Sequence, residues 1–232
     1  GVGGREVVLE LGSTAEVDGA WCPGTAERVL ERRRRDGRLV MVVDHHPDLG
    51  YRVYAPHNGH HLVSRDGARI FSTRPIHASW RWQRLLLAQV LPLAATLRGL
   101  ELLHASAVRW RGRTFGLVGP SGTGKTSVAA HVVARGGVLV TDDVLALEAA
   151  GDVPVAHPGA SALSIDPAEL MRMPGTGRRR LGLQVGRAEK VVLAAEVASA
   201  APLGRIYFLE RPSPGHLHIV PLPADPVADD PV

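Results

Sequence analysis

Cysteine and aromatic residues are scarce in this chain of 232 residues. The single cysteine, Cys22, excludes an internal disulfide, which fits a reducing compartment and makes the cytoplasm the expected location. Aromatic residues make up only 4% of the sequence, and none interrupts the arginine run 32–35 as the base-stacking side chains of a nucleic-acid site would. The run is therefore interpreted as the solvated end of a helix over 26–35, and no nucleic-acid partner is expected.

Long hydrophobic runs are missing as well. The longest apolar stretch, residues 85–97, is interrupted by Gln89 and Pro92 and is too short to span a bilayer. No signal peptide opens the sequence, so no membrane partner is expected. Hydrophobic residues still account for 45% of the chain, which is enough to bury a sizeable core in one large domain or two small ones.

Lysine is almost absent, although the formal net charge is +4. Among 27 lysine and arginine residues, only Lys125 and Lys190 are lysines. The chain uses arginine almost everywhere and yet has Lys125 in a glycine-rich loop. This indicates a site that needs the compact ammonium of lysine rather than the planar guanidinium of arginine. By the same reasoning, Lys190 is a secondary candidate.

The loop around Lys125 matches the phosphate-binding pattern GxxxxGK[ST]. Its glycines let successive backbone N–H groups turn inward around phosphate oxygens, while the lysine reaches the outer phosphates and the following threonine can hold Mg²⁺. The flanks agree, because the apolar run 114–118 predicts a buried strand and residues 127–134 predict a helix that ends at the glycine pair 136–137. The predicted nucleotide-binding residues are Gly119, Ser121, Gly122, Thr123, Gly124, Lys125, Thr126 and Ser127.

Two adjacent aspartates, Asp142 and Asp143, follow after an unusually short gap. They come at the C-terminal end of a short buried strand predicted at 138–141, where functional groups gather in α/β sheets. One helix and one turn fill the gap, so this strand is expected close to the P-loop strand. One carboxylate can then hold Mg²⁺ while the other accepts the proton of an attacking hydroxyl, which suits a kinase better than a hydrolytic motor.

His104 lies on a strand predicted at 102–108, directly before the P-loop strand. Its imidazole could orient, or pair with, the aspartate carboxylate that accepts the proton. The alternative is a histidine whose hydrogen bonds are satisfied within the sheet.

Residues 1–99 predict a small β-rich lobe that ends in a bridging helix. Its strands are expected at 7–11, 39–43 and 51–55 and in a hairpin over 61–71, followed by one helix at 80–98 or two joined at Pro92. Five histidines of this lobe invite a metal hypothesis, but no known ligand spacing repeats, and a polar loop is the favoured interpretation. They are His45, His46, His57, His60 and His61.

Residues 100–232 predict the second, P-loop domain. Further strands are expected at 144–148, 153–156 and 206–209, and Asp166 is predicted to cap a short helix with Glu169 completing a capping box. The Gly- and Arg-rich segment 175–186 is expected to be a mobile loop, and the segment after Leu222 is expected to be disordered.

Taken together, three segments resemble the catalytic domain of HPr kinase/phosphorylase and its relatives. They are Leu-His-Ala-Ser-Ala-Val at 103–108, the P-loop at 119–126, and the Arg-Gly-Gly and Thr-Asp-Asp elements at 135–137 and 141–143; residues 203–211 are similar to a later strand of that family. The resemblance implies an α/β fold of the HPr kinase and phosphoenolpyruvate carboxykinase type, with ATP and Mg²⁺ as cofactors. Family members usually continue with helices, so the resemblance leaves open that a C-terminal portion of the domain is missing from this sequence.

The resemblance also implies roles for individual residues. Lys125 would contact the phosphates and Thr126 the metal. Asp142 would be the base, Asp143 a metal ligand and His104 the partner of the acid pair, although the two aspartates can exchange roles. Either Arg187 or Lys190 would correspond to a basic residue of the substrate-side loop.

The chain departs from true HPr kinases because it lacks their Glu-x-Arg-Gly-Leu-Gly signature. HPr is therefore not the favoured acceptor. The arginine-rich region 172–187 and the β-rich first lobe favour a serine of a peptide or protein over a small amino acid. Relatives that phosphorylate lasso peptide precursors suggest a peptide natural product. Kinases of free serine or of HPr are alternatives, and an ATP-binding regulatory or scaffold module without transfer activity is an alternative of another class. The resemblance also allows a homo-oligomer.

Overall fold

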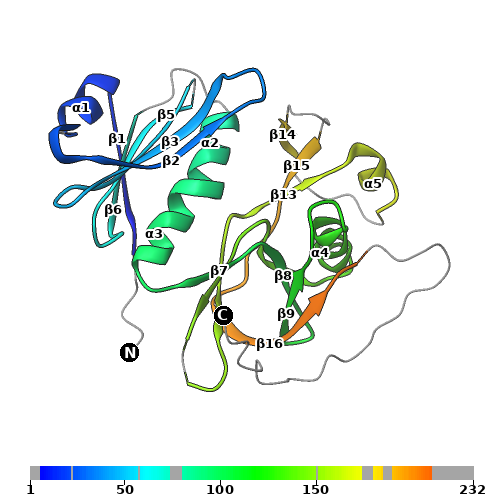
Figure 1. Cartoon of the computed structure of the whole chain (residues 1–232). Coiled ribbons are helices and arrows are strands. Elements are labelled where there is room, and N and C mark those ends of the chain that lie inside the picture. The colour runs from blue at the N-terminus through cyan, green and yellow to red at the C-terminus, as the bar shows by residue number, and fades with distance from the viewer. Residues whose placement is uncertain are drawn as a thin grey trace, which may run out of the picture.

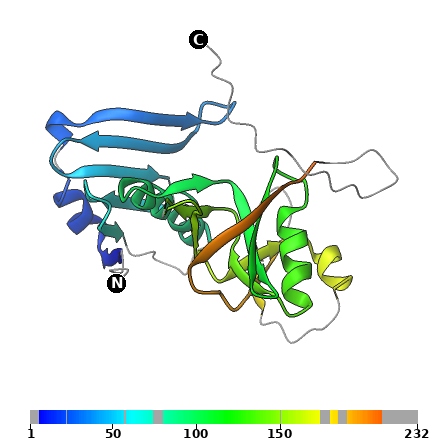
Figure 2. The same cartoon turned by 90° about the horizontal axis from the view of Figure 1, so that it is seen from below.

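The computed structural model describes residues 6–21, 23–56, 58–73, 80–149, 151–173, 180–184 and 190–210. Figures 1 and 2 show two lobes, each built on its own sheet, with a helical segment of the first lobe lying between that lobe's sheet and the second lobe. The expected tail after Leu222 lies outside the described residues. Within the described ranges, no helix is both long and apolar enough to cross a membrane.

The sheet of the first lobe has six strands in the order β1-β6-β5-β4-β3-β2, with β1 parallel to β6 and the other pairs antiparallel. The strands are β1 (Val8–Gly12), β2 (Glu27–Arg33), β3 (Leu39–His46), β4 (Gly50–Ala55), β5 (Gly59–Val63) and β6 (Arg69–Thr73). A short helix α1 (Thr14–Gly19) and a 3₁₀ turn η1 (Pro23–Thr25) join β1 to β2. The strands predicted at 7–11, 39–43, 51–55 and 61–71 are thereby confirmed.

One face of this sheet packs on the segment 80–97. That segment is a single helical run composed of α2 (Trp80–Leu85), a π-helical turn η2 (Leu86–Val90) and α3 (Leu91–Leu97). Leu86, Val90 and Ala94 are buried in the same hydrophobic cluster as Val53 and Ile70 of the sheet. The predicted helix is confirmed, and its irregularity is the π turn that precedes Pro92.

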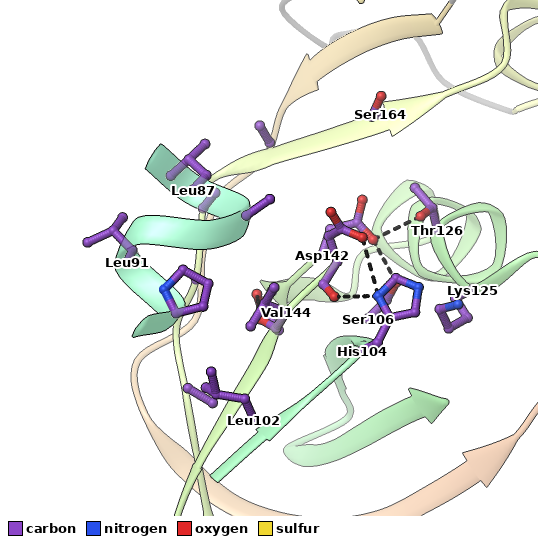
Figure 3. A pocket seen from close by; sticks show the side chains of 18 of the residues that line it. Leu87, Leu91, Leu102, His104, Ser106, Lys125, Thr126, Asp142, Val144 and Ser164 are labelled. Atoms are coloured by element: carbon purple, nitrogen blue, oxygen red, sulfur yellow. Dashed lines mark hydrogen bonds and ion pairs between the residues drawn. The ribbon is translucent and has the colours of Figure 1, made fainter. Parts of the chain in front are cut away.

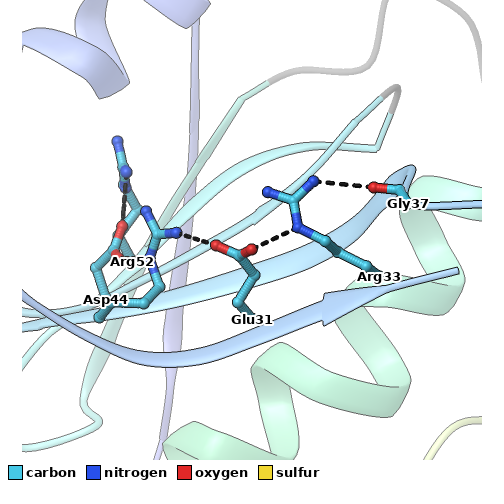
Figure 4. A network of polar contacts seen from close by, with 6 residues as sticks. Glu31, Arg33, Gly37, Asp44 and Arg52 are labelled. Carbon is cyan, nitrogen blue, oxygen red and sulfur yellow. Dashed lines mark hydrogen bonds and ion pairs between the residues drawn. The ribbon is translucent and has the colours of Figure 1, made fainter.

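The helix predicted at 26–35 is wrong, because residues 27–33 form the edge strand β2. Pairing decides the structure: Arg28 lies opposite Asp44 in the register of β2 and β3, and its Nε donates to Asp44 Oδ1 over 2.6 Å. Arg52 Nη2 donates to Asp44 Oδ2 over 2.6 Å, while Glu31 accepts from Arg28 and Arg33 (Figure 4). The two contacts of Asp44 cross between strands, and together with the pairing of β2 and β3 they outweigh the helical preference of the arginine-rich sequence.

The histidines of the first lobe do not form a polar loop, so that interpretation was wrong. His45 and His46 end β3, while His60 and His61 lie in β5. His61 is fully buried, and its Nδ1 lies 2.8 Å from the hydroxyl of Ser72. The described residues contain no group of three or more His, Cys, Asp or Glu side chains that could hold a metal, and His57 lies outside them.

The main sheet of the second lobe has seven strands in the order β10-β8-β9-β16-β12-β11-β7. They are β7 (Glu101–Leu103), β8 (Ala105–Trp110), β9 (Arg113–Val118), β10 (Val138–Thr141), β11 (Leu145–Glu148), β12 (Val155–His157) and β16 (Ala201–Phe208). Helix α4 (Lys125–Ala134) covers one face, where Ala129 and Ala130 are buried against Val108 and Leu139. Strand β8 separates β10 from the P-loop strand β9 and runs antiparallel to both, so β9 and β10 end at the same edge.

A second sheet of three strands lies beside α4, in the order β13-β15-β14. Its strands are β13 (Ala162–Ile165), β14 (Arg180–Gln184) and β15 (Lys190–Ala194), and α5 (Pro167–Met171) follows β13. Asp166 caps α5 as predicted, but Glu169 contacts His131 over 2.7 Å. The mobile loop predicted at 175–186 is wrong for residues 180–184, which form β14 and pair with β15.

Regular strand structure is interrupted twice at residues of the candidate site. The strand expected over 102–108 breaks at His104 into β7 and β8, which pair with different partners. The strand expected over 144–148 is confirmed as β11, which is separated from β10 by a bend at Asp142 and Asp143 and pairs with β7 and β12. Both breaks place polar side chains where regular pairing ends.

Candidate active site

The P-loop connects the end of β9 to the start of α4, which confirms the predicted strand and helix. Gly119 has φ 154°, and a Cβ added there would lie 2.4 Å from the carbonyl oxygen of Leu209. Gly124 caps α4 with a left-handed φ of 100°. The loop can therefore follow this path only with glycine at both positions, and it exposes the N-terminal N–H groups of α4, which favour an anion.

Lys125 is the first residue of α4, and only 7% of it is exposed. Its Nζ donates to the carbonyl oxygens of Gly119 over 2.7 Å and of Pro120 over 3.1 Å. The ammonium is thus held inside the curve of the loop. In that position it adds positive charge to the end of the helix at which phosphate groups bind in such loops.

Asp142 is the partly buried carboxylate of the site. Its Oδ1 accepts from Ser106 Oγ over 2.6 Å and from Thr126 Oγ1 over 2.9 Å, and the backbone of Ser164 also hydrogen-bonds to it. Burial raises the pKa of Asp142, and the nearby Asp143 adds to this, while the hydrogen bonds act in the opposite direction. The P-loop threonine and this aspartate therefore form one unit.

Asp143 points to a different neighbour. The Nδ1 of His104 lies 2.9 Å from the backbone oxygen of Asp143 and 3.4 Å from its Oδ1. A carbonyl oxygen can only accept, so Nδ1 carries the proton in this contact, and Nε2 of a neutral imidazole is left as the basic nitrogen. Asp143 also has a left-handed φ of 74°, a strained conformation that recurs at functional sites.

These groups line one cavity of about 710 Å³ between the two lobes (Figure 3). Of the residues predicted from the sequence, the cavity lining contains His104, Ser121, Gly122, Gly124, Lys125, Thr126, Ser127, Asp142, Asp143 and Lys190. Gly119 and Thr123 belong to the loop without lining the cavity, and Arg187 lies outside the described residues. Lys190 opens β15 and is exposed, so it is at the rim.

The sequence interpretation missed three features of the cavity: Ser106, Ser164 and an apolar wall from the helix 80–97. Ser106 had a signal, because it stands two residues after His104 and side chains two apart on a strand share a face. Ser164 comes from β13, and nothing in the sequence brings that strand to Asp142. The sequence predicts the helix at 80–98 only as a bridge between the lobes, without a face that lines a cavity.

The side chains fit a magnesium nucleotide. Mg²⁺ prefers oxygen ligands and is bound through one or two carboxylates and the phosphates of the substrate. The hydroxyl of Thr126 and the carboxylates of Asp142 and Asp143 are such oxygens, and Lys125 stands beside them on the P-loop. No soft sulfur ligand lines the described part of the cavity.

Comparisons with known proteins add little. No protein-family model and no curated protein matches the sequence. Among solved structures, the HPr(Ser) kinase/phosphatase from Coxiella burnetii aligns over 50% of this chain and 70% of its own, with 17% sequence identity and a TM-score of 0.32. At so low a TM-score the similarity carries no weight, and the function of this chain has to be inferred from its own residues.

Proposed function

We propose that this protein is an ATP-dependent kinase that transfers a phosphoryl group to a serine hydroxyl of a peptide or protein. The observation that carries the proposal is the division of the two adjacent carboxylates. Asp142 is hydrogen-bonded to the P-loop residue Thr126, while Asp143 is paired with His104 in the same cavity. Transfer to a hydroxyl requires an acceptor for the hydroxyl proton, and a second carboxylate beside the P-loop can take that role.

Each residue then has a distinct task. Lys125 and the N–H groups at the start of α4 hold phosphate oxygens, while Thr126 and Asp142 provide oxygen ligands for the metal. Bound Mg²⁺ would neutralise phosphate charge, and ATP would supply the phosphoryl group. Asp143 accepts the proton of the acceptor hydroxyl, and the Nδ1–H of His104, 3.4 Å from Asp143 Oδ1, helps to orient this carboxylate.

This assignment exchanges the two aspartates relative to the first expectation, an exchange that the sequence left open. Asp142 already accepts hydrogen bonds from Ser106 and Thr126, and its side chain is enclosed. Asp143 keeps 56% of its side chain exposed, so an incoming hydroxyl can approach it. The base is therefore assigned to Asp143 and the metal ligand to Asp142.

The open cavity between the lobes supports a peptide or protein as the acceptor. A serine in a ribosomally made precursor peptide, of the lasso type suggested by the family resemblance, would be such an acceptor. Free serine and HPr are the alternatives within the kinase class.

The test is to incubate the protein with Mg²⁺, γ-labelled ATP and serine-bearing peptides, including any peptide encoded beside its gene. Transfer of label to serine supports the proposal. Tight ATP binding without transfer to any serine would replace it with the regulatory or scaffold module. A variant of Lys125, Lys125→Ala, is the control that should lose both binding and transfer.

A further inference from the structure

The helical segment 80–97 carries two apolar faces. Leu86, Val90 and Ala94 are buried in the core of the first lobe, with exposed fractions of 7%, 0% and 0%. One position further along, Leu87 and Leu91 line the cavity of the active site, together with Ala88 and Ala95. A helix on a protein surface normally needs only one apolar stripe.

Packing within the first lobe does not account for the second face. Leu91 contributes to both faces, because it also packs against the core of its lobe. Leu87 belongs to none of the hydrophobic clusters formed by the described residues and is only partly buried. It lies in the π turn, and such turns inside α-helices are frequent at functional sites.

Leu87 and Leu91 lie across the cavity from Asp142, as Figure 3 shows. Leu102 of β7 extends the same apolar surface, and Thr126 and Asp142 form the opposite side. The phosphate end of the cavity is thus polar and the helix end apolar. An acceptor that reaches Asp143 with its hydroxyl has to place its neighbouring atoms near this helix.

Charge narrows the choice of acceptor. Among the described residues that line the cavity, the only carboxylates are Asp142 and Asp143, which the chemistry uses, while Arg84 and Arg98 add positive charge on the helix side. The ammonium group of free serine would lose its hydration in the cavity, and no further carboxylate among these lining residues would compensate for that loss. A basic side chain next to the serine would meet the two arginines, whereas an apolar one would be buried against leucine.

We infer that the helix wall at Leu87 and Leu91 selects a polypeptide acceptor that carries an apolar side chain beside the phosphorylated serine. The inference rests on the proposed kinase activity and specifies its substrate class. Leu87 is assigned as a specificity residue, and it takes no part in the transfer itself.

The experiment uses the full chain with Mg²⁺, γ-labelled ATP and a peptide library in which serine is fixed and the flanking positions are randomised. The wild-type protein should favour apolar over basic neighbours by about tenfold in kcat/KM. Leu87→Ala should reduce that preference, and Leu87→Arg should turn it towards acidic neighbours, with KM for ATP unchanged in both. A gained preference cannot arise from misfolding.

The matched control is Gln89→Arg, which places the same charge on the exposed side of the same π turn and outside the cavity lining. It should leave the preference as in the wild type. Transfer without any apolar preference, or a preference that Leu87→Arg leaves unchanged, would overturn the inference while the kinase proposal stands. If no serine peptide is labelled although ATP binds, both fall together.

Discussion

The hydroxyl of Thr126 donates to Asp142 over 2.9 Å, which joins the first turn of α4 to the end of β10. Thr126 follows β9 and Asp142 follows β10, and these two strands are not paired with each other because β8 lies between them. Ser106 of β8 completes the link through its own 2.6 Å hydrogen bond to the same carboxylate oxygen. The carboxylate is thereby fixed from two elements before any ligand binds.

Thr126→Val keeps the shape of the side chain and removes the hydroxyl. We expect the transfer rate to fall about 10- to 100-fold and the Mg²⁺ concentration needed for half-maximal rate to rise, because a metal ligand and a donor to Asp142 are lost together. Rates measured over a Mg²⁺ titration check this. Thr126→Ser retains the hydroxyl and should behave much like the wild type; equal Mg²⁺ dependence in Thr126→Val would contradict the metal role.

Asp143→Asn and Asp142→Asn separate the two carboxylates. Asp143→Asn should lower kcat about 10²- to 10⁴-fold with ATP affinity little changed, since a general base acts only in the chemical step. Asp142→Asn should mainly alter the Mg²⁺ dependence. Kinetics and nucleotide binding measured side by side check the assignment, and the opposite pattern would return the base to Asp142.

Asp44 should stabilise the first lobe in a pH-dependent manner. Burial alone would raise the pKa of Asp44, but the hydrogen bonds and charges of Arg28 and Arg52 outweigh burial and hold the pKa below its ordinary 3.8. Its contribution is therefore complete above the pKa of the unfolded chain and is lost as the pH falls through the lower folded value. Asp44→Asn should cost about 1–3 kcal/mol at pH 7. Urea unfolding should show this difference narrowing below about pH 4; a constant difference would count against the ion pairs.

His61 gives the first lobe a second pH dependence. Burial lowers its pKa from 6.5 to about 4, because the charged imidazolium would lose its hydration. The unfolded chain takes up the proton first, so stability should fall between these two values as the pH is lowered, by about 3 kcal/mol in all. His61→Gln should flatten this slope in urea unfolding between pH 7 and pH 5. A slope unchanged by the substitution would assign the effect to another group.

The parts of the site that local sequence determines were predictable. A strand, a glycine-rich loop and the helix from Lys125 follow one another along the chain, so their order and conformation could be inferred from residues 114–134. The short gap to Asp142 likewise placed both carboxylates at the same edge of the sheet, although β8 lies between the two strands.

Features that depend on distant pairing were not predictable. The arginines of 26–35 favour a helix locally, yet Asp44 and the antiparallel partner β3 make that segment a strand. The break at His104 arises because β7 pairs with β11 while β8 pairs with β9 and β10. In the helix 80–97, both apolar faces have the same spacing, so the core face and the cavity face cannot be distinguished from the residue pattern.

The two sides of the cavity come from separate stretches of the chain. Residues up to Arg98 supply the helix wall with Leu87 and Leu91. After the turn at Gly99, β7 adds Leu102 to the same apolar surface, and the phosphate side follows from β8 onward. A single crossover at this turn would exchange Leu87 and Leu91 and leave Lys125, Thr126 and both aspartates in place. Under the proposed function, recombination at Gly99 would therefore change the choice of acceptor without rebuilding the catalytic side.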